Sequence, residues 1–186
     1  MQSVEELLGI EGAPVQLVER SRDATLSPYL ARLCEMAPWL TVIPARCERE
    51  PCPRITIQGG STHGEIMFAG GLAGRLLEPF VIALRDLARG HADWDTPATP
   101  ARMAELRTKR ALRLAVSATC PHCPRVLGIV LRVALASPYV DVLVARADLG
   151  MTPDITAVPD LRIDRAPHPA TTLSEYALAD VLVGGE

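Results

Sequence analysis

Apolar and polar residues follow two different patterns along this chain, and segments with each pattern alternate. Compact apolar runs rich in valine, isoleucine and leucine predict strands, and apolar residues that recur every three or four positions predict helices. A serine or threonine before a proline, or a capping box, marks the start of several helices. The predicted strands cover residues 14–19, 39–43, 53–58, 64–69, 111–118, 139–145 and 160–164. The predicted helices cover residues 4–8, 28–36, 73–89, 99–108, 121–136, a single turn opening at 152–153, and a last helix from 173 to the glycines at 184–185.

Four local signals make this prediction more specific. Pro79 lies inside a predicted helix and indicates a kink or a late helix start. Thr172 and Glu175 have the spacing of a capping box at the last helix. Gly59-Gly60 marks the turn of a hairpin between two strands. Residues 165–170 contain two prolines and allow at most a short edge strand.

The order of these elements occurs twice. Each half reads helix, strand, helix, strand, proline-led strand, turn and helix, so that residues 53–57 align with residues 159–163. Residues 91–100 contain two prolines among aspartate and threonine and read as a linker between the halves. We therefore predict an α/β protein with two similar domains in tandem, each a mixed sheet flanked by helices. The predicted domains are residues 1–92 and 99–186.

Composition and charge narrow the range of functions. The chain has 186 residues, of which 48% are hydrophobic, enough for packed cores. A net charge of −3 and an aromatic content of 4% argue against a nucleic-acid partner. No apolar stretch is long enough to span a bilayer, and the acidic N-terminal residues precede only a short apolar patch, unlike a signal peptide. We expect a cytoplasmic protein without a membrane partner.

The stretch that carries the chemistry is Thr119-Cys120-Pro121-His122-Cys123-Pro124, between a predicted strand and a predicted helix. A Cys-x-x-Cys at such a junction is typical of proteins that exchange dithiols and disulfides. We expect Cys120 at the N-cap and Pro121 at the first helical position, so that the positive end of the helix dipole favours a Cys120 thiolate. Cys123 would then lie one turn further, where it can close a disulfide with Cys120.

Other roles for these cysteines were weighed against this prediction. Cys120 and Cys123 would also fit half of a zinc site, but such a site needs about four ligands. The remaining candidates, Cys47 and Cys52, lie in the other half, and we predict no metal site. Cys47 and Cys52 themselves fit either a second redox pair or two free thiols in a loop. Free thiols are favoured, because cytoplasmic thiols are mostly reduced.

Two further stretches add to the motif at residues 120–124: Val158-Pro159 before a strand, and residues 68–74, which run into a helix. In these stretches and in its tandem halves, the chain resembles the N-terminal domain of the alkyl hydroperoxide reductase flavoprotein and the archaeal protein disulfide oxidoreductases. The resemblance implies two thioredoxin-like folds that share an extended sheet, with Pro159 at the family's cis-proline and no cofactor. It also implies that Thr119, Val158 and Pro159 bind the substrate. The implied partners are proteins with disulfides or dithiols, including a peroxiredoxin and a thioredoxin-reductase-like flavoprotein.

The chain also departs from the family pattern. Thioredoxins usually have a buried acid on the strand before the motif, whereas residues 112–117 contain no carboxylate. The cysteine pair aligns with residues 21–24 of the first half, which contain no cysteine, so we expect that half to be redox-inactive. The chain has no flavin-binding region, which leaves at most the shuttle part of such a reductase.

We therefore predict a thiol–disulfide oxidoreductase in which Cys120 exchanges with the partner and Cys123 resolves the mixed disulfide. Pro121 and His122 are expected to tune the site, because a histidine beside the thiolate stabilises the dithiol form and makes the disulfide more oxidising than that of thioredoxin. An exposed histidine without a role also fits His122. Two alternative functions stay open: an electron shuttle to a peroxiredoxin, and a non-enzymatic thioredoxin-like chaperone or assembly factor.

Overall fold

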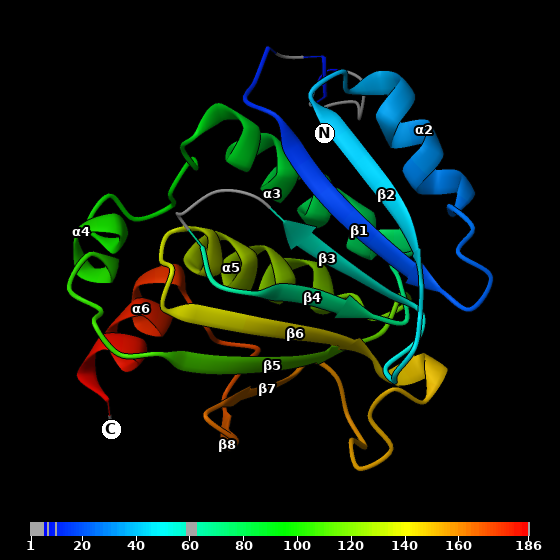
Figure 1. The fold of residues 1–186 in the computed structure, drawn as a ribbon. Helices are drawn as coiled ribbons and strands as arrows, with labels where there is room; N and C mark the ends of the chain where they lie inside the picture. Colours follow the sequence, from blue (N-terminus) through cyan, green and yellow to red (C-terminus); the bar gives the residue numbers. More distant parts are fainter. Residues whose placement is uncertain (1–5, 7, 10, 59–62, 186) are drawn as a thin grey trace.

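One mixed sheet of eight strands runs through the molecule, in the order β2-β1-β3-β4-β6-β5-β7-β8 (Figure 1). The computed structural model describes residues 6, 8–9, 11–58 and 63–185. The helix predicted over residues 4–8 lies mostly outside the described residues, and the predicted Gly59-Gly60 turn lies entirely outside them. The strands are β1 (Val15–Ser21), β2 (Leu40–Arg46), β3 (Arg54–Gln58), β4 (Ile66–Ala69), β5 (Arg110–Val116), β6 (Val140–Arg146), β7 (Asp160–Ile163) and β8 (Ala166–His168).

The strand pairing shows the same repeat as the sequence. In each half, the first strand pairs in parallel with the second and antiparallel with the third, and the third pairs antiparallel with the fourth. The short edge strand expected from residues 165–170 is present as β8, at one edge of the sheet. The predicted mixed α/β architecture with a shared sheet is therefore confirmed.

The two halves meet where β4 pairs in parallel with β6, with Ile66 opposite Val142. At the start of this seam, the backbone N–H of Glu65 donates a hydrogen bond to the Asp141 carboxylate at 2.8 Å. The preceding residue, Gly64, approaches the same strand so closely that a Cβ atom there would lie 2.4 Å from a carboxylate oxygen of Asp141. The seam therefore depends on a residue without a side chain.

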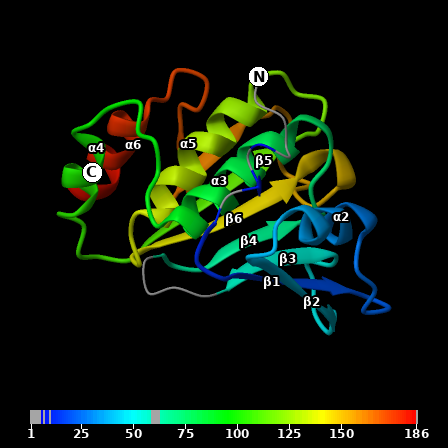
Figure 2. The same cartoon turned by 90° about the horizontal axis from the view of Figure 1, so that it is seen from above.

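Helices α3 and α5 lie side by side on one face of the sheet (Figure 2). Gly128 of α5 faces Pro79 of α3, because a Cβ atom there would lie at an ordinary van der Waals distance of 3.7 Å from the Pro79 side chain. None of the helices in the described part of the chain is long and apolar enough to cross a membrane. The helices are α2 (Pro28–Met36), α3 (Leu77–Arg89), α4 (Thr99–Met103), α5 (Cys123–Leu135) and α6 (Glu175–Gly184), with 3-10 turns η1 (Gly74–Leu76) and η2 (Ala147–Leu149).

The inner strands carry runs of buried side chains, and only some of their positions face solvent. Phe68 of β4 is buried and packs edge-to-face against Phe80 of α3, with ring centroids 5.1 Å apart. Leu114 of β5 is completely buried, whereas its neighbour Arg113 is exposed. These buried runs are the physical origin of the compact apolar runs from which the strands were predicted.

Several helix boundaries differ from the prediction. The late start expected from Pro79 is confirmed, because α3 begins only at Leu77, after a 3-10 turn. Helix α4 is shorter than predicted and ends at Met103, because the following residues turn and bury Leu106. The single helical turn predicted at residues 152–153 is wrong, since a 3-10 turn forms at 147–149 instead and ends in the left-handed Gly150.

The capping box predicted at residues 172–175 is also wrong. Ser174 is the N-cap of α6, and its side-chain oxygen accepts a hydrogen bond from the Ala177 N–H at 3.1 Å. Glu175 cannot serve in capping, because its buried carboxylate forms an ion pair with Arg132 of α5. The same carboxylate accepts a hydrogen bond from the Asp95 N–H at 2.9 Å. Glu175 thus joins α5, α6 and the linker between the halves.

We predict that Glu175→Ala lowers the free energy of unfolding by about 3 kcal/mol, because it leaves Arg132 and the Asp95 N–H without their buried partner. Urea unfolding at neutral pH measures this change. The matched control is Glu105→Ala, which removes an exposed carboxylate paired with Arg102 and should cost less than about 1 kcal/mol. Equal losses in the two variants would contradict the assigned role of Glu175.

Candidate active site

Cys120 and Cys123 lie at the carboxyl end of β5, where residues 117–122 lead into α5. Cys120 is in this loop and keeps 8% of its surface exposed, whereas Cys123 is the first residue of the helix and is 0% exposed. The strand-to-helix junction predicted for the motif is therefore present. Of the two thiols, only Cys120 has an exposed surface that a partner can reach.

The helix begins two residues later than predicted, at Cys123, with His122 as its N-cap. A helix capped by Cys120 would need a hydrogen bond from the backbone nitrogen of residue 124 to the Cys120 carbonyl, and Pro124 has no N–H. The first helical bond runs instead from the Val126 N–H to the His122 carbonyl, at 3.4 Å. The expectation that Cys120 is the N-cap and Pro121 the first helical residue is therefore wrong.

Cys120 nevertheless contacts the start of the helix through its sulfur. The backbone N–H of Cys123 donates a hydrogen bond to the Cys120 Sγ at 3.2 Å, which is the kind of donor that stabilises a thiolate. The Cys120 thiol in turn donates to the Val158 carbonyl at 3.7 Å. The peptide bond between Val158 and Pro159 is cis, as the resemblance implied. The fold thus brings the motif and Val158 together, although they are far apart in sequence.

Burial raises the pKa of the Cys123 thiol to about 12. A hydrogen bond with Cys120 and the negative charges of Cys120 and Asp148 raise this pKa further, and a hydrogen bond with the backbone of Ser117 opposes them. The Cys123 thiol is therefore protonated in the resting dithiol state. It can act as a nucleophile only when its proton is removed during the reaction.

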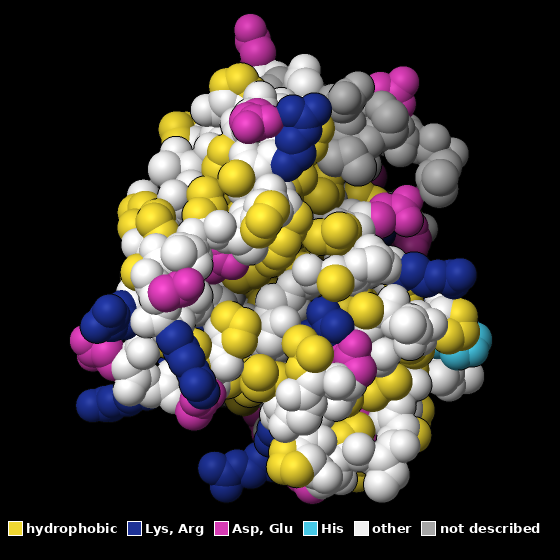
Figure 3. Space-filling model, turned by 90° about the vertical axis from the view of Figure 1, so that its right-hand side faces the viewer, with side chains coloured by type: hydrophobic (Ala, Val, Ile, Leu, Met, Phe, Trp, Pro, Cys, Tyr) yellow, Lys and Arg dark blue, Asp and Glu magenta, His cyan; other side chains and the backbone are white. Residues whose placement is uncertain are grey.

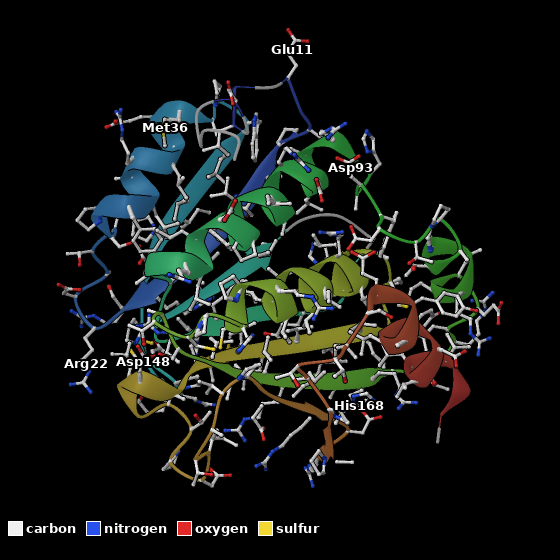
Figure 4. The ribbon with its side chains drawn as sticks, turned by 180° about the vertical axis from the view of Figure 1, so that it is seen from behind. Glu11, Arg22, Met36, Asp93, Asp148 and His168 are labelled. Atoms are coloured by element: carbon white, nitrogen blue, oxygen red, sulfur yellow. The ribbon has the colours of Figure 1, made fainter. Side chains whose placement is uncertain are left out.

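Asp148 is the carboxylate whose charge raises the pKa of the Cys123 thiol, and the sequence analysis did not identify it. It lies on η2, just after β6 (Figure 4). The nearly buried guanidinium of Arg146 binds it through two hydrogen bonds of 2.7 Å, which lower the pKa of Asp148 and keep it charged. Because β5 and β6 are parallel neighbours, their carboxyl ends meet at one edge of the sheet. The Arg146-x-Asp148 spacing after β6 was the signal that could have found it.

The remaining predicted site residues surround Cys120 with different exposures. Thr119, Pro121 and His122 are exposed, and Val158 and Pro159 are half-buried. The Thr119 hydroxyl is hydrogen-bonded to that of Ser117, at 3.2 Å.

His122 makes no side-chain hydrogen bond to any other residue in the described ranges. It projects from the surface at the start of the active-site helix.

The first half has no cysteine at the place that corresponds to the motif. Residues 22–27 link β1 to α2 just as residues 117–122 link β5 to α5, so Thr25 and Pro28 correspond to the two cysteines. The predicted alignment with residues 21–24 is therefore wrong by several positions. With the corrected alignment, the first half still has no cysteine pair at the position of the motif.

The other three cysteines are free thiols, like the motif pair. Cys34 lies on α2, where burial raises its pKa. Cys47 and Cys52 lie in the loop between β2 and β3. Among the residues that the structure describes, no group of three or more His, Cys, Asp or Glu side chains is arranged to hold a metal ion.

The face of the molecule at this edge of the sheet is shown in Figure 3. Apolar side chains gather across its middle, and most charged side chains lie towards its margins. Such a surface is suited to an extended polypeptide segment, whose apolar side chains can be covered while its backbone forms hydrogen bonds.

Comparisons with known proteins give a fold but no sequence relative. No model of a protein family matches the chain, and no curated protein matches it. A structure of the alkylhydroperoxide reductase AhpF from Enterococcus faecalis superposes with a TM-score of 0.80, at 17% identity, over 96% of this chain and 95% of that one. A protein disulfide oxidoreductase from Aeropyrum pernix gives a TM-score of 0.78, at 16% identity, over 98% of this chain and 90% of that one.

A third structure, of a Sulfolobus solfataricus protein, gives a TM-score of 0.66 at 15% identity, over 89% of this chain and 96% of that one. At sequence identities this low, the comparisons show only that the fold is shared. The predicted resemblance to these two groups and the tandem thioredoxin-like fold are confirmed.

We predict that alkylation by iodoacetamide at mildly alkaline pH labels Cys120 much faster than Cys123. A thiol with a pKa of about 12 is ionised to only about one part in ten thousand at pH 8, and burial also excludes the reagent. The measurement compares the rates at which the tryptic peptide 114–125 gains the label in the Cys123→Ser and Cys120→Ser proteins. Burial, the largest cause of the raised Cys123 pKa, persists in the second variant. Equally fast labelling of both would contradict the prediction, and faster labelling of Cys123 would reverse the assignment.

Proposed function

We propose that this protein is a thiol–disulfide oxidoreductase that exchanges dithiols and disulfides with protein partners through Cys120 and Cys123. The observation that carries the proposal is the difference between the two thiols. Cys120 keeps an exposed surface, and its Sγ accepts a hydrogen bond from the Cys123 N–H. Cys123 is completely buried, and the pKa of its thiol is raised. Cys120 is thus accessible to a partner, and Cys123 is buried behind it, where it can attack Cys120 in the second step.

In the reducing direction, the Cys120 thiolate attacks one sulfur of a partner disulfide. A bond forms between Cys120 and that sulfur, the partner's disulfide bond breaks, and the other partner sulfur leaves as a thiolate. This thiolate is a base, and it takes up the proton that Cys123 must lose. The Cys123 thiolate then attacks the Cys120 sulfur, which releases the second partner sulfur as a thiolate and leaves a Cys120–Cys123 disulfide. The partner gains two electrons and the protein loses two.

Asp148 and Arg146 act on this sequence through electrostatics. The charge of Asp148 disfavours a Cys123 thiolate and so helps Cys123 to keep its proton in the dithiol state. The two hydrogen bonds from Arg146 keep Asp148 charged and fix its position. We propose this pair in place of the buried acid that residues 112–117 lack.

We propose that the partner segment lies in extended form beside Cys120, against Thr119 and the Val158-Pro159 peptide. The hydrogen bond from Cys120 to the Val158 carbonyl supports this arrangement, because it places the start of β7 next to the reactive sulfur. The likeness of the fold to the alkylhydroperoxide reductase AhpF favours one partner class. This class is a peroxiredoxin that receives the electrons, with a thioredoxin-reductase-like flavoprotein as their source.

We predict that Cys120→Ser abolishes the protein's acceleration of insulin disulfide reduction by dithiothreitol, because the attacking sulfur is lost. Cys123→Ser should instead accumulate a mixed disulfide at Cys120, because nothing resolves it. Mass spectrometry of the trapped species after acid quenching reads this difference. Cys34→Ser is the matched control, since it removes a thiol on α2 and should leave turnover unchanged. Equal trapping by the two motif variants would contradict the assigned order of attack.

We predict that His122→Ala lowers the reduction potential of the motif by tens of millivolts, where about 30 mV corresponds to about 1.4 kcal/mol. The proposed reason is electrostatic, because positive charge on a histidine two residues after Cys120 would favour the thiolate and so stabilise the dithiol form. Equilibration against a glutathione series measures the potential. His91→Ala is the control, because His91 is also exposed but lies in the linker between the halves. An unchanged potential in His122→Ala would remove the tuning role.

A further inference from the structure

Cys47 and Cys52 occupy the loop that joins β2 to β3, outside the site described above. This loop is attached to the end of β1, because the backbone N–H of Cys47 donates a hydrogen bond to the Ser21 carbonyl at 2.8 Å. Ser21 is the last residue of β1, as Val116 is the last residue of β5. The two thiols therefore lie at the carboxyl end of the first half's central strand, the edge at which the motif stands in the second half.

The strand register gives Cys52 a specific counterpart. It immediately precedes Pro53 and β3, as Val158 precedes Pro159 and β7, and both X–Pro bonds are cis. In the second half, the residue at this place contacts the reactive sulfur of the motif through its carbonyl. In the first half, the same place carries a thiol. A sulfur nucleophile thus stands beside the position where the first half lacks its own cysteine pair.

The loop brings the two thiols together. The Cys47 thiol donates to the carbonyls of Arg49 and Pro51 at 3.7 and 3.8 Å, so the chain folds back over it. The Cys52 side chain is hydrogen-bonded to Cys47, and this contact, after burial, is the main cause that raises the pKa of Cys47 to about 11. Cys52 and Cys47 are both only partly buried.

Polar contacts hold the loop in this shape. The Cys52 N–H donates to the Glu50 carboxylate at 2.8 Å, and the Arg54 guanidinium donates to the Arg49 carbonyl at 3.1 Å. Glu50 in turn pairs with Arg22 at 3.8 Å, and Arg22 lies in the loop that corresponds to the motif. The cysteines are therefore neighbours in an ordered turn, close to solvent. No third ligand for a metal accompanies them in the described ranges.

We propose that Cys47 and Cys52 are a second dithiol–disulfide pair, which exchanges with small disulfides such as glutathione disulfide. Cys52 attacks one sulfur of glutathione disulfide, forms a mixed disulfide, and releases glutathione as a thiolate, which takes up a proton. Cys47 then gives up its proton and attacks the Cys52 sulfur, and the second glutathione leaves. The pair loses two electrons, and one glutathione disulfide becomes two glutathione molecules. Partly exposed disulfides in surface loops are commonly the labile ones, which suits reversible exchange.

The assignment of Cys52 as the attacking thiol follows from the contacts of Cys47. The Cys47 S–H is hydrogen-bonded to two carbonyls and its pKa is raised, so it remains a thiol until the mixed disulfide has formed. This inference does not depend on the proposed function of the motif. The two pairs lie on different tryptic peptides and are read separately.

The experiment equilibrates the full-length protein with glutathione mixtures of increasing oxidation, blocks free thiols with N-ethylmaleimide at low pH, and maps disulfides after trypsin digestion. Cleavage after the arginines at 46, 49 and 54 places the two cysteines on separate peptides, 47–49 and 50–54. A Cys47–Cys52 disulfide therefore joins two peptides. The motif cysteines share peptide 114–125, and Cys34 lies on peptide 33–46.

We expect the joined pair 47–49/50–54 to appear as glutathione disulfide increases and to vanish with dithiothreitol, while Cys34 stays alkylated. In Cys47→Ser, peptide 50–54 should carry glutathione instead, and insulin reduction should be unchanged. Cys120→Ser/Cys123→Ser should still form the joined pair, which separates this proposal from the function of the motif. Recovery of Cys47 and Cys52 as free thiols under mixtures that fully oxidise peptide 114–125 would overturn it. So would glutathione adducts without the joined pair.

Discussion

Backbone hydrogen bonds between β4 and β6 turn two four-stranded halves into one sheet, and the placement of one half against the other depends on this seam. The seam is parallel, so the carboxyl ends of β4, β5 and β6 point to the same edge. That edge carries the motif, Asp148 and the loop of Cys47 and Cys52. Close contact between the halves continues there, because a Cβ atom at Gly70 would lie 2.8 Å from the Arg146 Cβ and one at Gly74 would lie 3.0 Å from the Ala118 carbonyl. Residues of the first half thus help to shape the walls of the second half's site.

Much of the fold could be predicted because its signals are local. β-branched apolar runs mark strands wherever one face is buried, and Ser27-Pro28 and Thr99-Pro100 mark helix starts at which a missing N–H costs nothing. The errors arose where a distant partner competes for a local signal. Glu175 has the spacing for a capping box, but Arg132 and the Asp95 N–H bind its carboxylate instead, so Ser174 caps α6. A pattern search along the chain contains no information about such a partner.

In the candidate site, too, residues with a local sequence signal could be predicted, and residues that distant elements bring there could not. Cys120 and Cys123 could be identified from four consecutive residues, and Val158-Pro159 from the resemblance. Asp148 could not be found by spacing along the motif, because it reaches the site from the neighbouring parallel strand. The helix start at Cys123 was mispredicted for a reason that the sequence does contain. Pro124 removes the N–H that capping by Cys120 requires, and counting donors as well as preferred residues would have shown it.

The order of strands also fixes the distance between the central strands of the two halves. From β1 to β5 the sheet takes four steps, through β3, β4 and β6, and neighbouring strands are about 4.8 Å apart, so the two central strands are separated by about 19 Å. A disulfide bond spans only about 2 Å between its sulfurs. The two central strands are therefore too far apart for a disulfide to join them directly, and the hydrogen bonds of the shared sheet hold them at this separation. A relay of electrons between the two proposed pairs therefore needs either loops that cross this separation or a carrier molecule that diffuses from one pair to the other.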